Sequence, residues 1–226
     1  AARNITDTVD NVIIGKQAGE DNNENYNVII GSEAALNATS IASSVVIGRQ
    51  AMGAGAPTAN SNVTIGYRAA YNHTTGDDNV FIGTSAGHGN TTAALNTAVG
   101  KDALKAAQDS STGGSNSILG SQAATGTTGM RNSMVGFRAG FASTTADSNV
   151  YIGYEAGAKI TTGDYNVCLG QKSGPSSTNT DSSKLYIHND EGTPLIGGDF
   201  SAGTVNIDGT LDSAGLFTAA SGINVA

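Results

Sequence analysis

A short alternation of polar and apolar residues recurs along most of the chain. Its form is Asn-Val-x-Ile-Gly-x-x-Ala, a three-residue apolar run between an asparagine and a glycine. The ten copies begin at Asn11, Asn27, Ser44, Asn62, Asn79, Asn96, Asn116, Asn132, Asn149 and Asn166. The glycines of successive copies are 16 to 20 residues apart, and most often 17. Ten copies in one register predict a repeat architecture in which each copy belongs to one coil.

Each column of the repeat suggests its own structural role. Val-x-Ile is typical of a short β-strand, in which the first and third residues share one face and the middle residue takes the other. The glycine, as at Gly66, permits backbone angles that turn a corner. The alanine three residues later, as at Ala69, indicates a narrow interior. The asparagines predict a ladder of stacked side-chain amides.

The coil length restricts the fold class. About 17 residues are too few for a strand–helix–strand unit, which takes about 30. Pairs of Thr or Ser, such as Thr74-Thr75, precede most of the asparagines and predict a turn or a weak second strand. We therefore expect an all-β, parallel β-solenoid of about ten coils over residues 1–174. The extra residues of the longest coil, around 106–109, should form a loop on one edge.

The repeat fades after Gly174. A polar link leads to two apolar runs, at 184–189 and 204–209, which predict strands separated by Gly-rich turns. We expect residues 175–226 to form a separate, β-rich fibre or linker segment.

The middle residues of the ten strands predict self-association. Nine of the ten are apolar or aromatic, the exception being Thr64. If the first and third residues cover the coil interior, the middle residues face outward and need a partner, because a strand that is apolar on both faces is buried on both. A homo-oligomer about a closed axis satisfies this, and three chains are favoured. The expected interface residues are Ile13, Ile29, Val46, Phe81, Ile118, Met134 and Tyr151.

The ten-fold Val-x-Ile-Gly-x-x-Ala/Ser repeat resembles the head domains of trimeric autotransporter adhesins, and the same repeat occurs in bacteriophage tail-fibre-like proteins. In the latter it is often followed by a segment similar to residues 184–200 and then by a self-cleaving chaperone domain. The resemblance covers roughly residues 5–174 and 184–210. It implies a left-handed β-roll packed as an intertwined or side-by-side homotrimer. The coils here are longer than the usual adhesin coil, and the 226 residues include neither a heptad stalk nor a chaperone domain.

Composition and charge exclude several partners. The chain has 226 residues, of which 13% are charged, with a net charge of −8. Its eleven basic residues are scattered, so nucleic acid binding is not expected. No apolar run approaches the ~20 residues of a transmembrane helix, so membrane insertion is not expected. The single cysteine, Cys168, occupies a strand position and is predicted to be a small buried hydrophobe.

The sequence offers little catalytic chemistry. Asp77, Asp147 and Asp164 recur at turn positions, where aspartate favours turns by bonding its own backbone. The three histidines, at 73, 88 and 188, are not spaced as metal ligands. We expect no enzyme activity, no cofactor and no metal.

Aromatic residues after the glycine corners are the candidates for surface recognition, since a sugar could stack on an exposed ring. They are Tyr67, Tyr71, Phe137, Phe141 and Tyr154. The alternative is that these rings pack between coils or between chains.

These observations predict a non-enzymatic structural or adhesive fibre segment, extracellular or on a virion. The leading hypothesis is a bacteriophage tail fibre that mediates or spaces attachment to a host-surface glycan or protein. The alternatives are a bacterial adhesin head or extracellular filament subunit, and a glycan-degrading tailspike.

Overall fold

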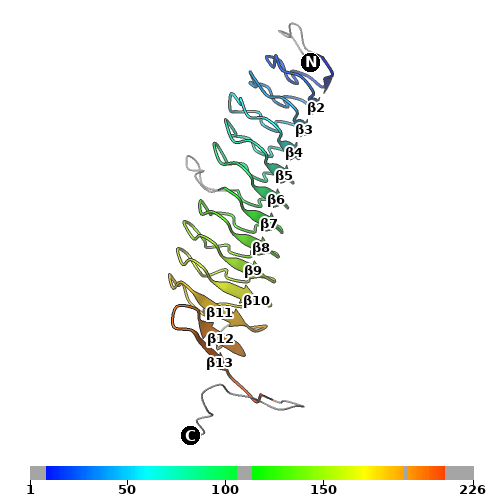
Figure 1. Cartoon of the computed structure of the whole chain (residues 1–226). Helices are drawn as coiled ribbons and strands as arrows, with labels where there is room; N and C mark the ends of the chain where they lie inside the picture. Colours follow the sequence, from blue (N-terminus) through cyan, green and yellow to red (C-terminus); the bar gives the residue numbers. More distant parts are fainter. Residues whose placement is uncertain (1–8, 106–113, 191–192, 212–226) are drawn as a thin grey trace.

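The chain forms a long stack of coils (Figure 1). The computed structural model describes residues 9–105, 114–190 and 193–211. Across these ranges the protein is all-β, without a helix, and its thirteen strands form one sheet in sequence order. The predicted β-solenoid of about ten turns is confirmed. The loop expected around 106–109 lies outside the described residues.

Ten three-residue strands run down one side of the stack. They are β1 (Val12–Ile14), β2 (Val28–Ile30), β3 (Val45–Ile47), β4 (Val63–Ile65), β5 (Val80–Ile82), β6 (Thr97–Val99), β7 (Ser117–Leu119), β8 (Ser133–Val135), β9 (Val150–Ile152) and β10 (Val167–Leu169). Neighbouring strands are parallel, and each residue pairs with its counterpart one coil away, as Val63 does with Val80. Equivalent residues therefore lie above one another along the whole stack.

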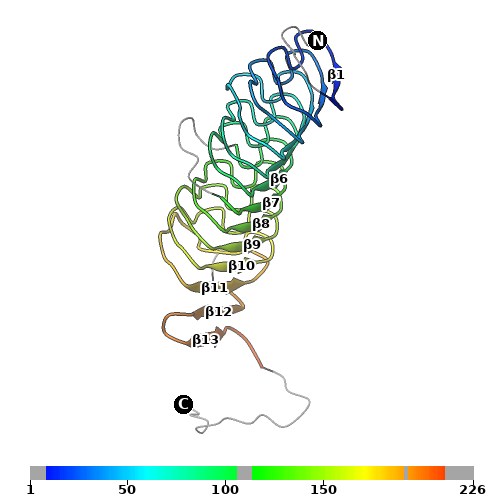
Figure 2. The same cartoon turned by 45° about the horizontal axis from the view of Figure 1, so that its top comes forward.

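Three further strands complete the sheet at the C-terminal end (Figure 2). β11 (Lys184–Ile187) continues the parallel stack on β10, whereas β12 (Ile196–Asp199) and β13 (Thr204–Ile207) pair antiparallel. The strands expected at 184–189 and 204–209 are present with shorter bounds. β12 was not expected, because its Ile-Gly-Gly-Asp sequence lacks a β-branched alternation.

The middle residue of each strand points into the coil, which is the opposite of the predicted orientation. Ile29, Val46, Phe81, Ile118, Met134 and Tyr151 are essentially inaccessible to solvent, and Ile13 is partly buried against them. The assignment of these seven residues to an oligomer interface is wrong. Cys168 is buried in the same column, as predicted, and burial raises the pKa of its thiol to about 12.

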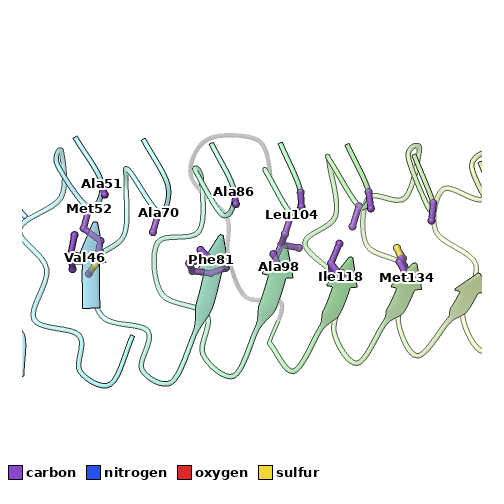
Figure 3. Close-up of a cluster of buried hydrophobic side chains, with 14 of the residues drawn as sticks. Val46, Ala51, Met52, Ala70, Phe81, Ala86, Ala98, Leu104, Ile118 and Met134 are labelled. Atoms are coloured by element: carbon purple, nitrogen blue, oxygen red, sulfur yellow. The ribbon is translucent and has the colours of Figure 1, made fainter. Parts of the chain in front are cut away.

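Several coils fill their interior with a complementary pair of side chains, one large and one small (Figure 3). The strand's middle residue faces the residue six positions later, beyond the glycine corner. Phe81 is matched by Gly87, whereas in the next coil Ala98 is matched by Leu104. A Cβ at Gly87 would lie 2.5 Å from the Phe81 ring. Likewise Tyr151 is matched by Gly157, where a Cβ would lie 2.6 Å from its ring. In these coils the space between the two positions thus holds one large side chain, from either side.

The corner glycines are needed for two reasons. Gly66 has φ +137°, a conformation that L side chains rarely adopt. A Cβ at this position would also lie 2.5 Å from the carbonyl oxygen of Gly83, the equivalent glycine one coil away. Gly31, Gly48 and Gly100 show the same close approach. The corner therefore excludes side chains because the coils stack so closely there.

The asparagine ladder is confirmed and also bonds the backbone. The Asn116 Oδ1 accepts from the Asn132 backbone N–H at 2.9 Å and from the Asn132 amide at 3.2 Å. The Asn116 amide donates to Asn96 Oδ1 and to the Gly129 carbonyl, each at 3.0 Å. These asparagines are almost fully buried, so each side chain satisfies polar groups that water cannot reach. Ser44 replaces one of them, and its hydroxyl accepts from the Asn62 N–H at 3.2 Å.

The volume match predicts that the pair Phe81/Gly87 can be exchanged for the pair found in the next coil. Phe81→Ala alone should cost about 3–5 kcal/mol of unfolding free energy through the cavity it leaves. Gly87→Leu alone should also destabilise, because the new side chain overlaps the ring. The double variant, which copies Ala98/Leu104, should recover about 0.5–3 kcal/mol relative to the sum of the single effects. Denaturant unfolding followed by circular dichroism measures this coupling, and strict additivity would contradict the pairing.

The ladder predicts a graded response at Asn116. Asn116→Ala leaves the Asn132 N–H and the Gly129 carbonyl buried without these partners, at a cost of about 1–3 kcal/mol for each group. Asn116→Ser should cost less, because a serine hydroxyl serves the same position at Ser44. Thermal and denaturant unfolding of the two variants test this order. Equal loss in both would show that the amide bonds contribute little.

Candidate functional surface

The outward face of the parallel sheet is apolar. It consists of the first and third residues of each strand, which flank the buried middle residue. The third residue is aliphatic in all ten coils: Ile14, Ile30, Ile47, Ile65, Ile82, Val99, Leu119, Val135, Ile152 and Leu169. The first residue is valine except at Thr97, Ser117 and Ser133. We call the surface formed by these first and third residues the outer apolar face.

The outer apolar face is open to solvent in the single chain. Leu119 is 52% exposed and Ile152 is 45% exposed, although both lie within strands. An exposed apolar stripe is therefore present, as predicted, but different residues form it. The first and third residues of each strand lie outside, whereas the predicted middle residues are buried. Both strand faces are apolar, and the interior has room for only one of them.

The structure gathers the candidate aromatics into two clusters at the glycine corners. The first cluster, the arginine–tyrosine corner, comprises Arg49, Tyr67, Arg68, Tyr71 and His88 from three successive coils. The Arg49 and Arg68 guanidinium carbons lie 5.7 and 5.4 Å from the Tyr67 ring centroid. The Arg68 carbon is also 4.9 Å from the Tyr71 centroid, and Tyr71 stacks on His88 at 5.3 Å between centroids.

The second cluster, the phenylalanine corner, comprises Phe137, Arg138, Phe141, Tyr154 and Glu155. Phe137 stacks on Tyr154 of the next coil at 5.4 Å, and the Arg138 guanidinium carbon is 4.2 Å from the Phe141 centroid. A carboxylate completes this cluster, because Arg138 Nη1 is 3.8 Å from Glu155 Oε1. These rings pack between coils, as the alternative interpretation held, and yet Phe137 and Tyr154 remain exposed.

The arginines of these clusters were not among the sequence candidates. Their signal was available in the repeat: Arg68 and Arg138 both lie two residues after a corner glycine, and Tyr71 and Phe141 both lie five residues after it. Positions one, two and five after the glycine therefore form one ridge of neighbouring side chains.

The recurring aspartates bond the neighbouring coil. Asp77 Oδ1 accepts from the Asn60 N–H at 2.7 Å, and Asp164 Oδ1 accepts from the Asp147 N–H at 2.7 Å. The expectation that they bond their own turn is therefore corrected. Threonine hydroxyls act similarly, since Thr74 Oγ1 donates to the Thr91 carbonyl at 2.8 Å. Both columns serve to hold one coil on the next.

The three histidines occupy separate environments. His73 is buried, with Nδ1 3.1 Å from the Asn90 carbonyl and Nε2 2.6 Å from the Gly76 carbonyl. His88 lies at the arginine–tyrosine corner, and His188 Nε2 accepts from the Gly174 N–H at 3.0 Å. No group of three or more His, Cys, Asp or Glu suited to a metal is found within the described ranges.

A shallow groove lies between β11, β12 and β13. Lys184, Tyr186, Gly197 and Asp199 are among its lining residues. Lys184 Nζ donates to Asp199 Oδ2 at 2.6 Å, and this ammonium holds the pKa of the carboxyl well below its usual range. Both groups are thus engaged with each other. No helix capable of crossing a membrane occurs in the part of the chain that the structure describes.

Burial of His73 predicts a pH dependence of stability. Desolvation lowers the pKa of His73 below its usual value, and the hydrogen bonds to Gly76 and Asn90 only partly oppose this. The neutral imidazole is therefore favoured in the fold, and its contribution is present above the unfolded pKa of about 6.5 and lost as the pH falls through the folded pKa. Unfolding midpoints at pH 7 and pH 5 should differ more for the native chain than for His73→Gln. An equal difference in both would contradict this role.

Comparisons with family models, curated proteins and solved structures found no match to this chain. The resemblance to adhesin heads and tail-fibre-like proteins therefore rests on the repeat itself.

Proposed function

We propose that this chain is a non-enzymatic, self-associating segment of an extracellular or virion fibre, with a structural and adhesive role. The fibre of a bacteriophage tail, mediating or spacing host attachment, is the form that the repeat resemblance favours. The observation that supports the proposal is the outer apolar face, in which the third residue of the strand is aliphatic in all ten coils.

The outer apolar face supports self-association on energetic grounds. Soluble monomers rarely expose large contiguous apolar patches, and such patches mark interaction sites. Here the patch repeats with the coil, so it runs the length of the ten-coil stack. A partner that matches it along this length is most simply a second copy of the same chain, and closed symmetry about the stack axis covers the face in every copy. Three copies is the number that the resemblance implies.

The bonding of the polar columns supports a structural role. Each carboxylate that could serve a glycosidase accepts a hydrogen bond from a backbone N–H of the preceding coil; these are Asp77, Asp147 and Asp164. Glycoside hydrolysis needs two carboxyl groups facing one another across a bound sugar. A regular column of backbone-bonded aspartates instead stiffens the stack, as a spacer requires.

The proposal predicts the mass of the protein and its response to charge on the outer face. Light scattering should give a multiple of 22.5 kDa, and about three times this value for the favoured trimer. Leu119→Lys combined with Ile152→Lys places two ammonium groups on exposed face positions and should give a folded species near 22.5 kDa.

The matched control carries the same two charges on the threonine column, as Thr145→Lys with Thr162→Lys, both exposed. It should keep the mass of the native chain. A native chain that is monomeric and folded, or a face variant whose mass is unchanged, would overturn the proposal.

A further inference from the structure

The arginine–tyrosine corner brings positively charged and hydroxyl-bearing aromatic side chains together on the surface. It places two arginines from successive coils beside two tyrosines, in a chain whose net charge is −8. Neither Arg49 nor Arg68 forms an ion pair within the described ranges, whereas Arg131 and Arg138 pair with Asp147 and Glu155. Neither guanidinium of the corner is therefore neutralised by a direct ion pair with a described residue.

The guanidinium of Arg68 is fixed before any ligand arrives. Its Nε donates to Gln50 Oε1 at 2.9 Å, and Gln50 Nε2 in turn donates to Glu33 Oε2 at 2.7 Å. The carboxylate of Glu33 thus orients Gln50, and Gln50 orients Arg68. The packing of Arg68 against the Tyr67 and Tyr71 rings adds cation–π attraction on the flat side of the group. What remains for a ligand is the pair of terminal nitrogens, already held in place.

The neighbouring titratable groups that the structure describes add no unpaired cation to the corner. Burial lowers the pKa of His88, and the charges of Lys105 and Arg68 lower it further. The ammonium of Lys105 is itself paired with Asp102 at 3.1 Å. His88 is therefore an uncharged ring at neutral pH, stacked on Tyr71, and among the described residues the corner cations without an ion pair are Arg49 and Arg68.

We infer that the arginine–tyrosine corner binds the carboxylate of an acidic sugar in a surface polysaccharide. A guanidinium presents paired N–H donors that match a carboxylate, and fixing it in advance reduces the entropy lost on binding. The rings of Tyr67 and Tyr71 pack against these arginines, and their hydroxyls suit sugar hydroxyls as donors and acceptors. The rings support the arginines, so recognition uses guanidinium and hydroxyl groups more than stacking on an open ring face.

This inference rests on the proposed adhesive function, of which it specifies the ligand. The phenylalanine corner provides an internal comparison. It has the same ridge positions and a similar aromatic packing, but its arginine is paired with Glu155 and its rings at 137 and 141 carry no hydroxyl. It should not bind the acidic sugar.

The test measures binding of hyaluronan, a uronate-bearing polymer, to the immobilised native chain, with dextran as the neutral polymer and dextran sulfate as a general polyanion. Arg49→Gln and Arg68→Gln should each weaken hyaluronan binding at least about tenfold, the effect of losing a charge-assisted hydrogen bond. Both substitutions suit the fold, because Gln171 occupies the column of Arg49, and Gln50 occupies that of Arg68 with a similar positive φ. Arg68→Lys should also lose binding, since lysine lacks the paired donors.

Arg138→Gln is the matched control and should bind as the native chain does. Absence of hyaluronan binding, equal binding of dextran sulfate, or equal loss in Arg138→Gln would overturn the inference. Mass measured on the same samples separates this result from the fibre proposal. Corner variants that keep the native mass and lose the sugar support the inference, and variants that change the mass would place the corner in the subunit interface instead.

Discussion

Stacking of each coil on its equivalent, residue above residue, is the constraint on which the rest of this structure depends. Parallel pairing aligns Val63 with Val80 and Ile65 with Ile82, and the same register holds from β1 to β10. Every column must then accept a copy of itself at the spacing of adjacent strands, about 4.8 Å. The glycine column satisfies this by having no side chain where Gly66 meets Gly83. The asparagine column satisfies it by bonding to itself, as Asn116 bonds Asn132.

The interior imposes a second condition, which acts within each coil. In several coils the space inside the corner holds one large side chain, supplied by the strand or by the residue six positions later. Phe81 with Gly87 and Ala98 with Leu104 are two solutions of the same problem in adjacent coils. Close-packed interiors tolerate changes that conserve volume, so the two positions vary together while the backbone repeats.

These conditions constrain the interior and the corners but not the outer surface, where equivalent side chains of successive coils form columns that can take on a function. A side chain outside the coil meets the equivalent side chains above and below it, so a single substitution in the repeat places new chemistry beside existing neighbours. The outer apolar face arises because the third residue of the strand stays aliphatic through ten coils. The arginine–tyrosine corner arises because Arg49, Tyr67 and His88 come from three successive coils at neighbouring ridge positions. The proposed assembly and the proposed sugar site thus use different columns of one scaffold.

The sequence by itself determined the period, the all-β class, the glycine corners and the asparagine ladder, because each repeats often enough to exclude chance and has one physical explanation. It could not determine which face of the strand lies inside. Both faces of the Val-x-Ile strand are apolar, so the alternation of residues does not show which face is buried. Ile29 is therefore predicted to lie outside, whereas it lies in the core. A large residue at position 81 is accompanied by glycine at position 87, and this match in volume could have predicted that the middle residue of the strand faces the interior. Only the tertiary structure decided which strand face lies inside. The corner brings positions 81 and 87 together across a space that holds one large side chain. The tertiary structure also decided which charges remain free, since Arg138 meets Glu155 while Arg68 meets Gln50, and such pairing depends on which side chains adjacent coils place side by side.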